Sequence, residues 1–369
     1  MKLNFFTLFI LLTLGSMKIM AQNKINLIVG TYTNGSSKGI YSFCFDQSTG
    51  KAHPLDTLEL MNPSFITFSK DGTKIYSVCE IDTTAAAASA ISFDRKSGKM
   101  KLMNTQHTDC NGPCYISTNG DLVLTANYTG GGMSVFPLAK DGSLKPMSQI
   151  FLGTTAPSDM PQQHSAHVHC AQFTTDGKYV LATDFSANRL MRFEFAYKTK
   201  LKSVGTAAIV SRNSGPRHFV FSHNNQFMYV ISELTEAVTV FKYGNGEMQR
   251  LQEIQSDSVG GHGGADIHIS PDGRFLYTSN RLKDDGISVF TVNIKTGLIN
   301  KIGYQLTGIH PRNFNITPNG KFLLCACRDS NIIQVFSINK ATGLLTNTKQ
   351  DIDLDKPVCV QFYTPNKNK

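Results

Sequence analysis

A repeated pair of apolar runs constrains this chain more than any other feature of its sequence. Each first run is rich in β-branched and aromatic residues and ends at an Asp-Gly-like turn that leads directly into a second apolar run. The first runs begin at Pro63, Pro113, Ala166, Pro216, Ala265 and Pro311. Two such runs joined by a tight turn predict a β-hairpin. The starts lie about 50 residues apart, which is typical of the blades of a β-propeller.

A third run follows each hairpin, as in the segments that begin at Gly132, Ala237 and Gly286, and a second turn closes it. Four short antiparallel strands per repeat are therefore expected. A small twisted sheet of this kind buries both faces only against its neighbours, which favours a ring of blades. Because no long segment spaces its apolar residues at three, four and seven, helices are not expected and the chain is predicted to be all-β.

The two ends of the chain supply the parts of one further blade. Near the N-terminus, the runs from Leu27 and Gly39 match the second and third strands of a blade, whereas the run from Pro357 matches a first strand with nothing after it. Pairing Pro357–Tyr363 with Leu27–Thr33 completes a seventh blade and removes an open sheet edge. The prediction is a single seven-bladed β-propeller over residues 22–369, closed by its N- and C-terminal strands.

The first residues have the pattern of a secretory signal peptide. Met1 and Lys2 precede a mostly apolar run from Phe5 to Leu14, and the small residue Ala21 follows after a polar interruption. The apolar run is too short to span a bilayer. We therefore expect residues 1–21 to be cleaved and the mature chain to lie in the periplasm or outside the cell, without a membrane partner. An uncleaved anchor is the alternative.

Charge and cysteine content bear on the partners of the chain. The 36 Lys and Arg residues exceed the 27 Asp and Glu residues, but they are spread without a long run, so no nucleic-acid partner is expected. Most of the eight cysteines lie among apolar residues of strand-like segments, where cysteine packs as a small core residue. Cys110 and Cys114 are the candidate disulfide. The cysteine spacings lack the partner pairs of a zinc site, so we predict no metal and no cofactor, and we expect a monomer.

Polar side chains recur at one end of the predicted hairpins. Since the two strands of a hairpin are antiparallel, the start of the first and the end of the second lie at the same end of the sheet. If every first strand lines the channel, these residues form a ring at one mouth. Strand starts supply Asn62, His167, His169, Arg217, His218, Asp266, His268, Arg312 and Asn313, and strand ends supply Glu80, Asn127, Asp184, Glu233, Asn280, Arg281 and Arg328. Such groups are costly unless they are paired or functional, and ties between blades are the alternative reading. The long connection from Leu144 to Ser165 is a candidate lid or binding loop.

The motifs GTYT, AHVH, SGPRHFVF with ISEL, SPDGRFLYTSNR and HPRNF, in this order, resemble the lactonase family of seven-bladed propellers. That family includes bacterial 6-phosphogluconolactonase and fungal carboxy-muconate cyclase, and the resemblance covers nearly the whole mature chain. It implies an active-site pattern that falls on His169, Arg217, Glu233 and then Arg281 or Arg312. The sixth hairpin departs from the family, with Cys327 and Arg328 where Asn-Gln is usual. The signal peptide is a second departure, because 6-phosphogluconolactone is a cytoplasmic metabolite, and it leaves the lactone open.

The resemblance implies hydrolysis of a sugar lactone. This reaction needs a proton acceptor for the attacking water and positive charge at the developing oxyanion. We assign Glu233 or His169 as the base, Arg217 to the oxyanion, and Arg281 with Arg312 to a substrate carboxylate or phosphate. Further substrate contacts are expected from His167, Asp184, His218, Asn280, Arg312 and Asn313. His167, His169 and Asp184 would also imitate a metal site, but the reaction does not require one. The alternatives are a muconate-type lactone cyclase, which would use the same residues, and a non-catalytic binding propeller.

Overall fold

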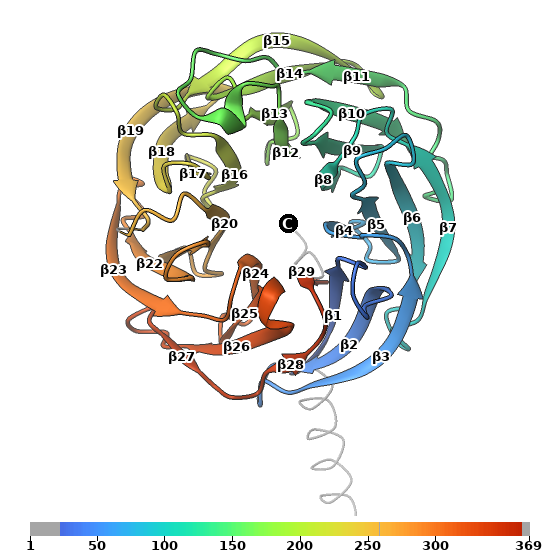
Figure 1. Cartoon of the computed structure of the whole chain (residues 1–369), viewed down its shortest axis with the longest axis vertical. Coiled ribbons are helices and arrows are strands. Elements are labelled where there is room, and N and C mark those ends of the chain that lie inside the picture. Colours follow the sequence, from blue (N-terminus) through green and yellow to red (C-terminus); the bar gives the residue numbers. More distant parts are fainter. Residues whose placement is uncertain (1–22, 258, 364–369) are drawn as a thin grey trace, which may run out of the picture.

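The chain folds into a closed ring of seven antiparallel sheets (Figure 1). The computed structural model describes residues 23–257 and 259–363. The first run of every repeat forms the innermost strand of its blade, so the predicted all-β, seven-bladed propeller is confirmed. The expected signal peptide, residues 1–21, lies outside the described residues.

Six blades take their strands from consecutive sequence, in order from the axis outward. The first is β4 (Ile66–Phe68), β5 (Lys74–Cys79), β6 (Ala87–Phe93) and β7 (Met100–His107). The second is β8 (Pro113–Thr118), β9 (Leu122–Asn127), β10 (Gly132–Pro137) and β11 (Gln149–Leu152). The third is β12 (Val168–Phe173), β13 (Tyr179–Asp184), β14 (Arg189–Tyr197) and β15 (Lys200–Ile209).

The remaining three follow the same plan. The fourth is β16 (Pro216–Phe221), β17 (Phe227–Ser232), β18 (Ala237–Gly244) and β19 (Glu247–Gln255). The fifth is β20 (Gly264–Ile269), β21 (Phe275–Asn280), β22 (Gly286–Val292) and β23 (Ile299–Leu306). The sixth is β24 (Pro311–Ile316), β25 (Phe322–Cys327), β26 (Ile332–Ile338) and β27 (Leu345–Asn347), and here β28 (Ile352–Asp353) also pairs with β26. Its outer position is thus shared by two short strands, where one was expected.

The seventh blade joins the two ends of the chain. It consists of β29 (Pro357–Phe362), β1 (Lys24–Thr31), β2 (Gly39–Asp46) and β3 (Ala52–Glu59). Leu27 pairs with Phe362 and Val29 with Val360, which confirms the predicted closure. Gly30 is required here, because a Cβ at this position would lie 2.1 Å from the carbonyl oxygen of Pro63 in the next blade.

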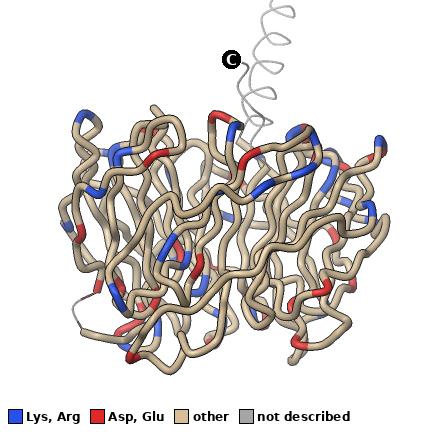
Figure 2. The backbone as a smooth tube through the Cα atoms, turned by 90° about the horizontal axis from the view of Figure 1, so that it is seen from above, with Lys and Arg blue, Asp and Glu red and all other residues tan. Residues whose placement is uncertain are grey.

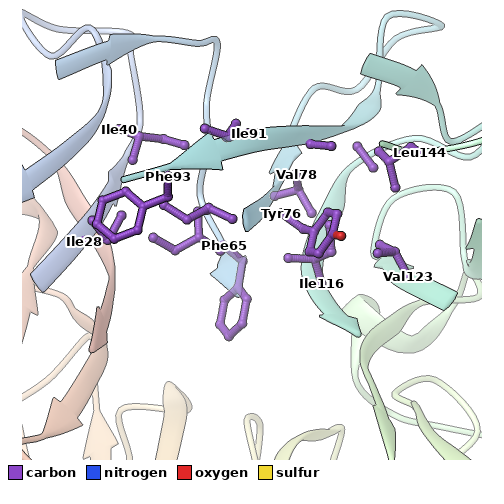
Figure 3. Close-up of a cluster of buried hydrophobic side chains, with 14 of the residues drawn as sticks. Ile28, Ile40, Phe65, Tyr76, Val78, Ile91, Phe93, Ile116, Val123 and Leu144 are labelled. Atoms are coloured by element: carbon purple, nitrogen blue, oxygen red, sulfur yellow. The ribbon is translucent and has the colours of Figure 1, made fainter. Parts of the chain in front are cut away.

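Apolar side chains fill the space between adjacent blades. In Figure 3, Ile28 and Ile40 of the seventh blade meet Ile91 and Phe93 of the first, and the same cluster continues to Ile116. Full burial of one such side chain stabilises the fold by about 1.5–3 kcal/mol. Charged residues concentrate in the turns and loops at the two faces of the ring (Figure 2). The apolar strands therefore fix the ring and leave its two mouths free for polar residues.

All eight cysteines are free thiols, so the candidate disulfide between Cys110 and Cys114 is not present. The two side chains face different neighbours. Cys114 Sγ donates a hydrogen bond to the carbonyl oxygen of His169 in the next blade, at 3.4 Å, whereas Cys110 Sγ lies beside the backbone of Gly130 and Gly132. Within the described part of the chain, no helix is long and apolar enough to cross a membrane; two single 3₁₀ turns occur, η1 (Pro161–Gln163) and η2 (Arg328–Ser330).

Candidate active site

The innermost strands of six blades carry a β-bulge near the start, at the same mouth of the ring. In β29 the pairing with β1 skips Val358. The pairing register shifts in β8 between Pro113 and Tyr115, in β12 between Val168 and Ala171, in β16 between Pro216 and His218, in β20 between Gly264 and Ile267, and in β24 between Pro311 and Asn313. A bulge inserts one extra residue, so consecutive side chains no longer alternate strictly between the two faces. In β16 this lets both Arg217 and His218 contact the next blade.

Glu233, the residue after β17, forms ion pairs with Arg217 of its own blade and with Arg281 of the next blade. Its Oε2 accepts a hydrogen bond from Arg217 Nε at 2.9 Å, and its Oε1 lies 3.2 Å from Arg281 Nη2. Arg217 and Arg281 are only 1% and 4% exposed. Both carboxylate oxygens are therefore occupied by buried guanidinium groups, which fixes the position of these groups.

Backbone carbonyls complete the support of the two arginines. Arg217 Nη1 donates to the carbonyl oxygen of Ala265 at 2.6 Å, and Arg281 Nε donates to that of Gly263 at 2.9 Å. Arg281 Nη1 also lies 3.4 Å from Nε2 of His310. Among the described residues no hydrogen bond uses Arg217 Nη2, so this nitrogen remains available as a donor.

A second ion pair comes from the other side of the ring. Arg312 in β24 places Nη2 3.5 Å from both oxygens of Glu80, the residue after β5. The hydroxyl of Tyr32 donates to the same carboxylate at 3.0 Å, and the Arg312 guanidinium lies 5.4 Å from the centre of the Tyr32 ring. The sixth, seventh and first blades therefore meet in this group.

His169 in β12 is a buried imidazole without a hydrogen-bonding partner on Nδ1 among the described residues. Its ring lies edge-on to His218, with 5.1 Å between ring centres, and to Tyr128, at 5.5 Å. Burial and the positive charge of Arg217 hold the pKa of His169 well below its usual 6.5. The imidazole is therefore neutral at physiological pH, with an unused nitrogen.

The pKa of Glu233 reflects two opposed effects. Burial raises it, but the charges of Arg281, Arg217 and Arg312 outweigh burial, and the pKa falls below the ordinary value of 4.5. Arg312 thus acts on Glu233 even though its own partner is Glu80. The two ion-paired groups form one electrostatic cluster, in which Glu233 stays ionised and both of its oxygens are engaged by arginines.

Aromatic side chains from three blades meet beside the cluster. The rings of Phe65 and Tyr115 stack with 4.1 Å between their centres, and His218 meets both edge-on, at 5.7 and 5.1 Å. Tyr115 belongs to the second blade and His218 to the fourth, which are not neighbours. Their contact therefore spans the inner strand of the third blade, which lies between them.

The structure brings most of the predicted site residues together and leaves two apart. His169, Arg217, Glu233, Arg281, Arg312 and His218 lie in the cluster, and Asn313 joins it through Asp266. His167 lies at its rim, stacked on Tyr128 with 4.1 Å between ring centres. Asp184 and Asn280 instead bond away from the cluster, each to its own blade and to the connection from the preceding one: Asp184 to Arg189 and Thr154, and Asn280 to Ser288 and Ser256.

Asp184 and Asn280 lie apart from the cluster because side chains alternate strictly between the two faces of the sheet at these strand ends. Asn280 is the last residue of β21 and points into the sheet, so its neighbour Arg281 points to the cluster. Asp184, the last residue of β13, is likewise fully buried. His167, His169 and Asp184 do not gather, and the described residues contain no group of three His, Cys, Asp or Glu side chains arranged for a metal.

The long connection from Leu144 to Ser165 is not one loop. It contains the outer strand β11, and only residues 153–165 connect two blades. Gln163 is buried there, and its Nε2 donates to the carbonyl oxygen of Phe185 at 2.7 Å and to Asn188 Oδ1 at 2.8 Å. These bonds anchor the loop on the third blade, and Figure 1 shows the loop near β13.

Sequence reasoning missed Tyr32, Tyr128 and His310 as neighbours of the cluster, and it gave Glu80 no role. A signal for three of these was present. Tyr32, Glu80 and Tyr128 each follow the second strand of a blade, at the repeat position that Glu233 and Arg281 also occupy. Reading this position strictly around the ring would have identified them.

The depressed histidine pKa values predict that mild acid weakens the fold. Burial lowers the pKa of His218 to about 4 and that of His169 well below 6.5. Between these values and 6.5 the unfolded chain binds more protons than the folded one, so the free energy of unfolding falls as the pH falls. For His218 alone the loss is about 2 kcal/mol at pH 5. Urea unfolding at pH 7 and pH 5 measures it, and equal stability at both would contradict it.

Comparison with known proteins identifies the family of the chain. Residues 26–362 match the family described as lactonase, seven-bladed beta-propeller. A 6-phosphogluconolactonase of Bacillus subtilis is 34% identical, over 90% of this chain and 97% of its own length. The crystal structure of a Bacteroides uniformis protein is 52% identical, covers 93% of this chain and 100% of its own, and has a TM-score of 0.91. The periplasmic gluconolactonase of Pseudomonas aeruginosa is 31% identical, with 92% and 99% coverage and a TM-score of 0.87. With its blades, its closing strand and nearly its whole described length matched, this chain belongs to the seven-bladed β-propeller lactonase family.

Proposed function

We propose that the chain hydrolyses the ring ester of a sugar lactone at the mouth cluster. One observation carries the proposal: a neutral imidazole with an unused nitrogen, His169, lies among three guanidinium groups that carboxylates fix in place. Ester hydrolysis needs both a proton acceptor and positive charge that is already oriented. The family supports the same reading, since its relative in Bacillus subtilis is a 6-phosphogluconolactonase.

The proposed reaction proceeds by addition and collapse. His169 takes a proton from water as the water oxygen forms a bond to the lactone carbonyl carbon. Arg217 donates from Nη2 to the carbonyl oxygen, which becomes an oxyanion. When the oxyanion re-forms the carbonyl, the bond to the ring oxygen breaks, and the protonated His169 returns its proton to that oxygen. The product is the open hydroxy acid. A low imidazole pKa makes the protonated form a strong acid for this last step.

Glu233 has a different role in this scheme. Sequence reasoning left Glu233 and His169 as alternative bases. Both Glu233 oxygens accept from arginines, whereas Nδ1 of His169 has no partner among the described residues, so the contribution of Glu233 is to orient Arg217 and Arg281. The proton acceptor is therefore His169.

The charge of the cluster indicates the kind of lactone. Three arginines, Arg217, Arg281 and Arg312, face two carboxylates, Glu233 and Glu80. Guanidinium groups suit a substrate phosphate and, equally, the carboxylate that every lactone yields on opening. We further propose that the signal peptide expected over residues 1–21 directs export and that the substrate is an unphosphorylated sugar lactone, which the likeness to the periplasmic gluconolactonase of Pseudomonas aeruginosa supports.

A panel of lactones tests the proposal. Purified protein beginning at residue 22 is mixed with glucono-1,5-lactone, its 6-phosphate and neutral non-sugar lactones, and acid release is followed above the spontaneous rate. We expect turnover of at least one sugar lactone and its loss in His169→Ala. If the protein accelerates none of them but binds them, the non-catalytic propeller is the correct reading; if it closes muconate-type acids instead, the cyclase is.

A further inference from the structure

Asp266 joins the innermost strands of three blades near the cluster. This side chain, 3% exposed, accepts hydrogen bonds from His218 Nδ1 at 2.7 Å and from His268 Nε2 at 3.0 Å. Asn313 Nδ2 donates to it from β24, and the backbone N–H of Ile267 adds a further bond at 3.0 Å. So many donors hold Asp266 as a carboxylate. Although burial raises its pKa, the neighbouring His268 and His218 rings, with the donated hydrogen bonds, hold it far below its usual range.

An ionised Asp266 determines where His218 carries its hydrogen. Because a carboxylate only accepts, the hydrogen of the neutral imidazole must be on Nδ1, and Nε2 is left with a lone pair. Nε2 lies 3.4 Å from Arg217 Nη1. That nitrogen has two hydrogens, and it donates one to the carbonyl oxygen of Ala265 at 2.6 Å. The second faces the lone pair of His218.

The opposite tautomer would place an N–H group of His218 against an N–H group of Arg217. Two donors in contact at a buried site repel each other and leave both without an acceptor. Arg217 is 1% exposed, so water does not compensate for the loss. The guanidinium would have to turn. Nη2 would then leave its present position, which is set by the bonds of Nε to Glu233 and of Nη1 to Ala265.

We propose that His218 and Asp266 form a positioning dyad, in which Asp266 sets the tautomer of His218 and His218 orients the Arg217 guanidinium toward the substrate. The inference rests on the proposed function, because it assigns the dyad to the arginine that stabilises the oxyanion there. The dyad explains why the bulge in β16 brings Arg217 and His218 to the same side: the two residues act as one unit.

Two substitutions of His218 separate positioning from packing. In His218→Asn the side-chain amide replaces Nδ1 and donates to Asp266, but nothing replaces Nε2. In His218→Gln the longer side chain brings a carbonyl oxygen to the place of Nε2, and the bond to Asp266 is lost. We expect His218→Asn to keep a melting temperature near that of the parent and to lose roughly tenfold or more in kcat, with KM changed less. We expect His218→Gln to be less stable and yet more active than His218→Asn.

The matched control is His223→Asn. His223 belongs to the same blade but lies in the turn at the other mouth, where its Nε2 contacts the carbonyl oxygen of Ser270 at 2.8 Å. This variant should keep parental kcat. If kcat in both His218 variants simply follows the fraction of folded protein, or if His218→Asn is fully active, the dyad is not a positioning device.

A readout without turnover keeps this inference separate from the proposed function. Nitrogen-15 NMR of the histidine rings distinguishes a hydrogen on Nδ1 from one on Nε2. We expect His218, assigned by comparison with His218→Asn, to carry its hydrogen on Nδ1 in the parent and to change tautomer in Asp266→Asn. If the parent hydrolyses no lactone but shows this tautomer, the proposed function fails and the Asp266–His218 arrangement stands; a hydrogen on Nε2 in the parent overturns the dyad whatever the activity.

Discussion

Replacing Arg217 with alanine is expected to lower kcat/KM for lactone hydrolysis by about 100-fold or more, because it removes a donor that is oriented toward the developing oxyanion. The arginine is held by Glu233, Ala265 and His218, so its geometry is set before substrate binds. Such preorganised charge in a site with little water acts mainly on the transition state. Initial rates over a range of lactone concentrations, corrected for spontaneous opening, measure the effect.

Stability must be followed on the same preparations, since Arg217 also connects two blades. Glu233→Gln keeps the shape of its side chain but frees the two arginines, and it should reduce turnover to a similar degree. Arg274→Ala is the matched control, because Arg274 lies at the turn of the fifth blade, half exposed and paired with Asp272. Parental activity of Arg217→Ala on every lactone that the parent hydrolyses would exclude the cluster as the catalytic site.

Deleting the chain from Pro357 onward is expected to abolish the folded, soluble protein. The seventh blade would lose β29, its innermost strand, and β1 would present an unpaired edge. Val360 and Phe362 pack into a cluster with Leu324 and Val335 of the sixth blade, so that contact is lost as well. Circular dichroism melting and the soluble yield measure the outcome.

A deletion of residues 364–369 alone is the control for this experiment, because it leaves every described strand in place. It should give the parental melting transition. A protein shortened at Pro357 that still melts cooperatively at the parental temperature would show that closure by β29 contributes little to stability.

The fold could be predicted in detail because its determinants repeat. Each blade depends on a local pattern of two apolar runs and a turn, and the pattern occurs often enough for its period to be read directly. Closure followed from counting the strands of each repeat, since the run at Leu27 lacked a first strand before it and the run at Pro357 lacked a second strand after it. The double outer position of β27 and β28 could not be predicted, because outer strands are half exposed and their pattern is weak.

The site was predicted less completely, for two geometric reasons. The bulge in β16 was not predicted from the sequence, so the shared direction of Arg217 and His218 did not follow from strand alternation. In two blades, the position at the end of the second strand was also assigned from the sequence one residue too early. Asn127 and Asp184 were taken for the position that Tyr128 and Phe185 occupy, which displaced Asp184 into the site and left Tyr128 out.

The pairing of β29 with β1 also sets the order in which this protein can form during synthesis. β1 is the first described strand to be made and β29 the last, so the inner edge of β1 lacks its partner until β29 has been made. Contacts so far apart in sequence form slowly. Arg312 and Glu80 come from the two blades that flank this closing blade. Their ion pair is therefore assembled only when the ring closes, and an incomplete chain has no finished active site.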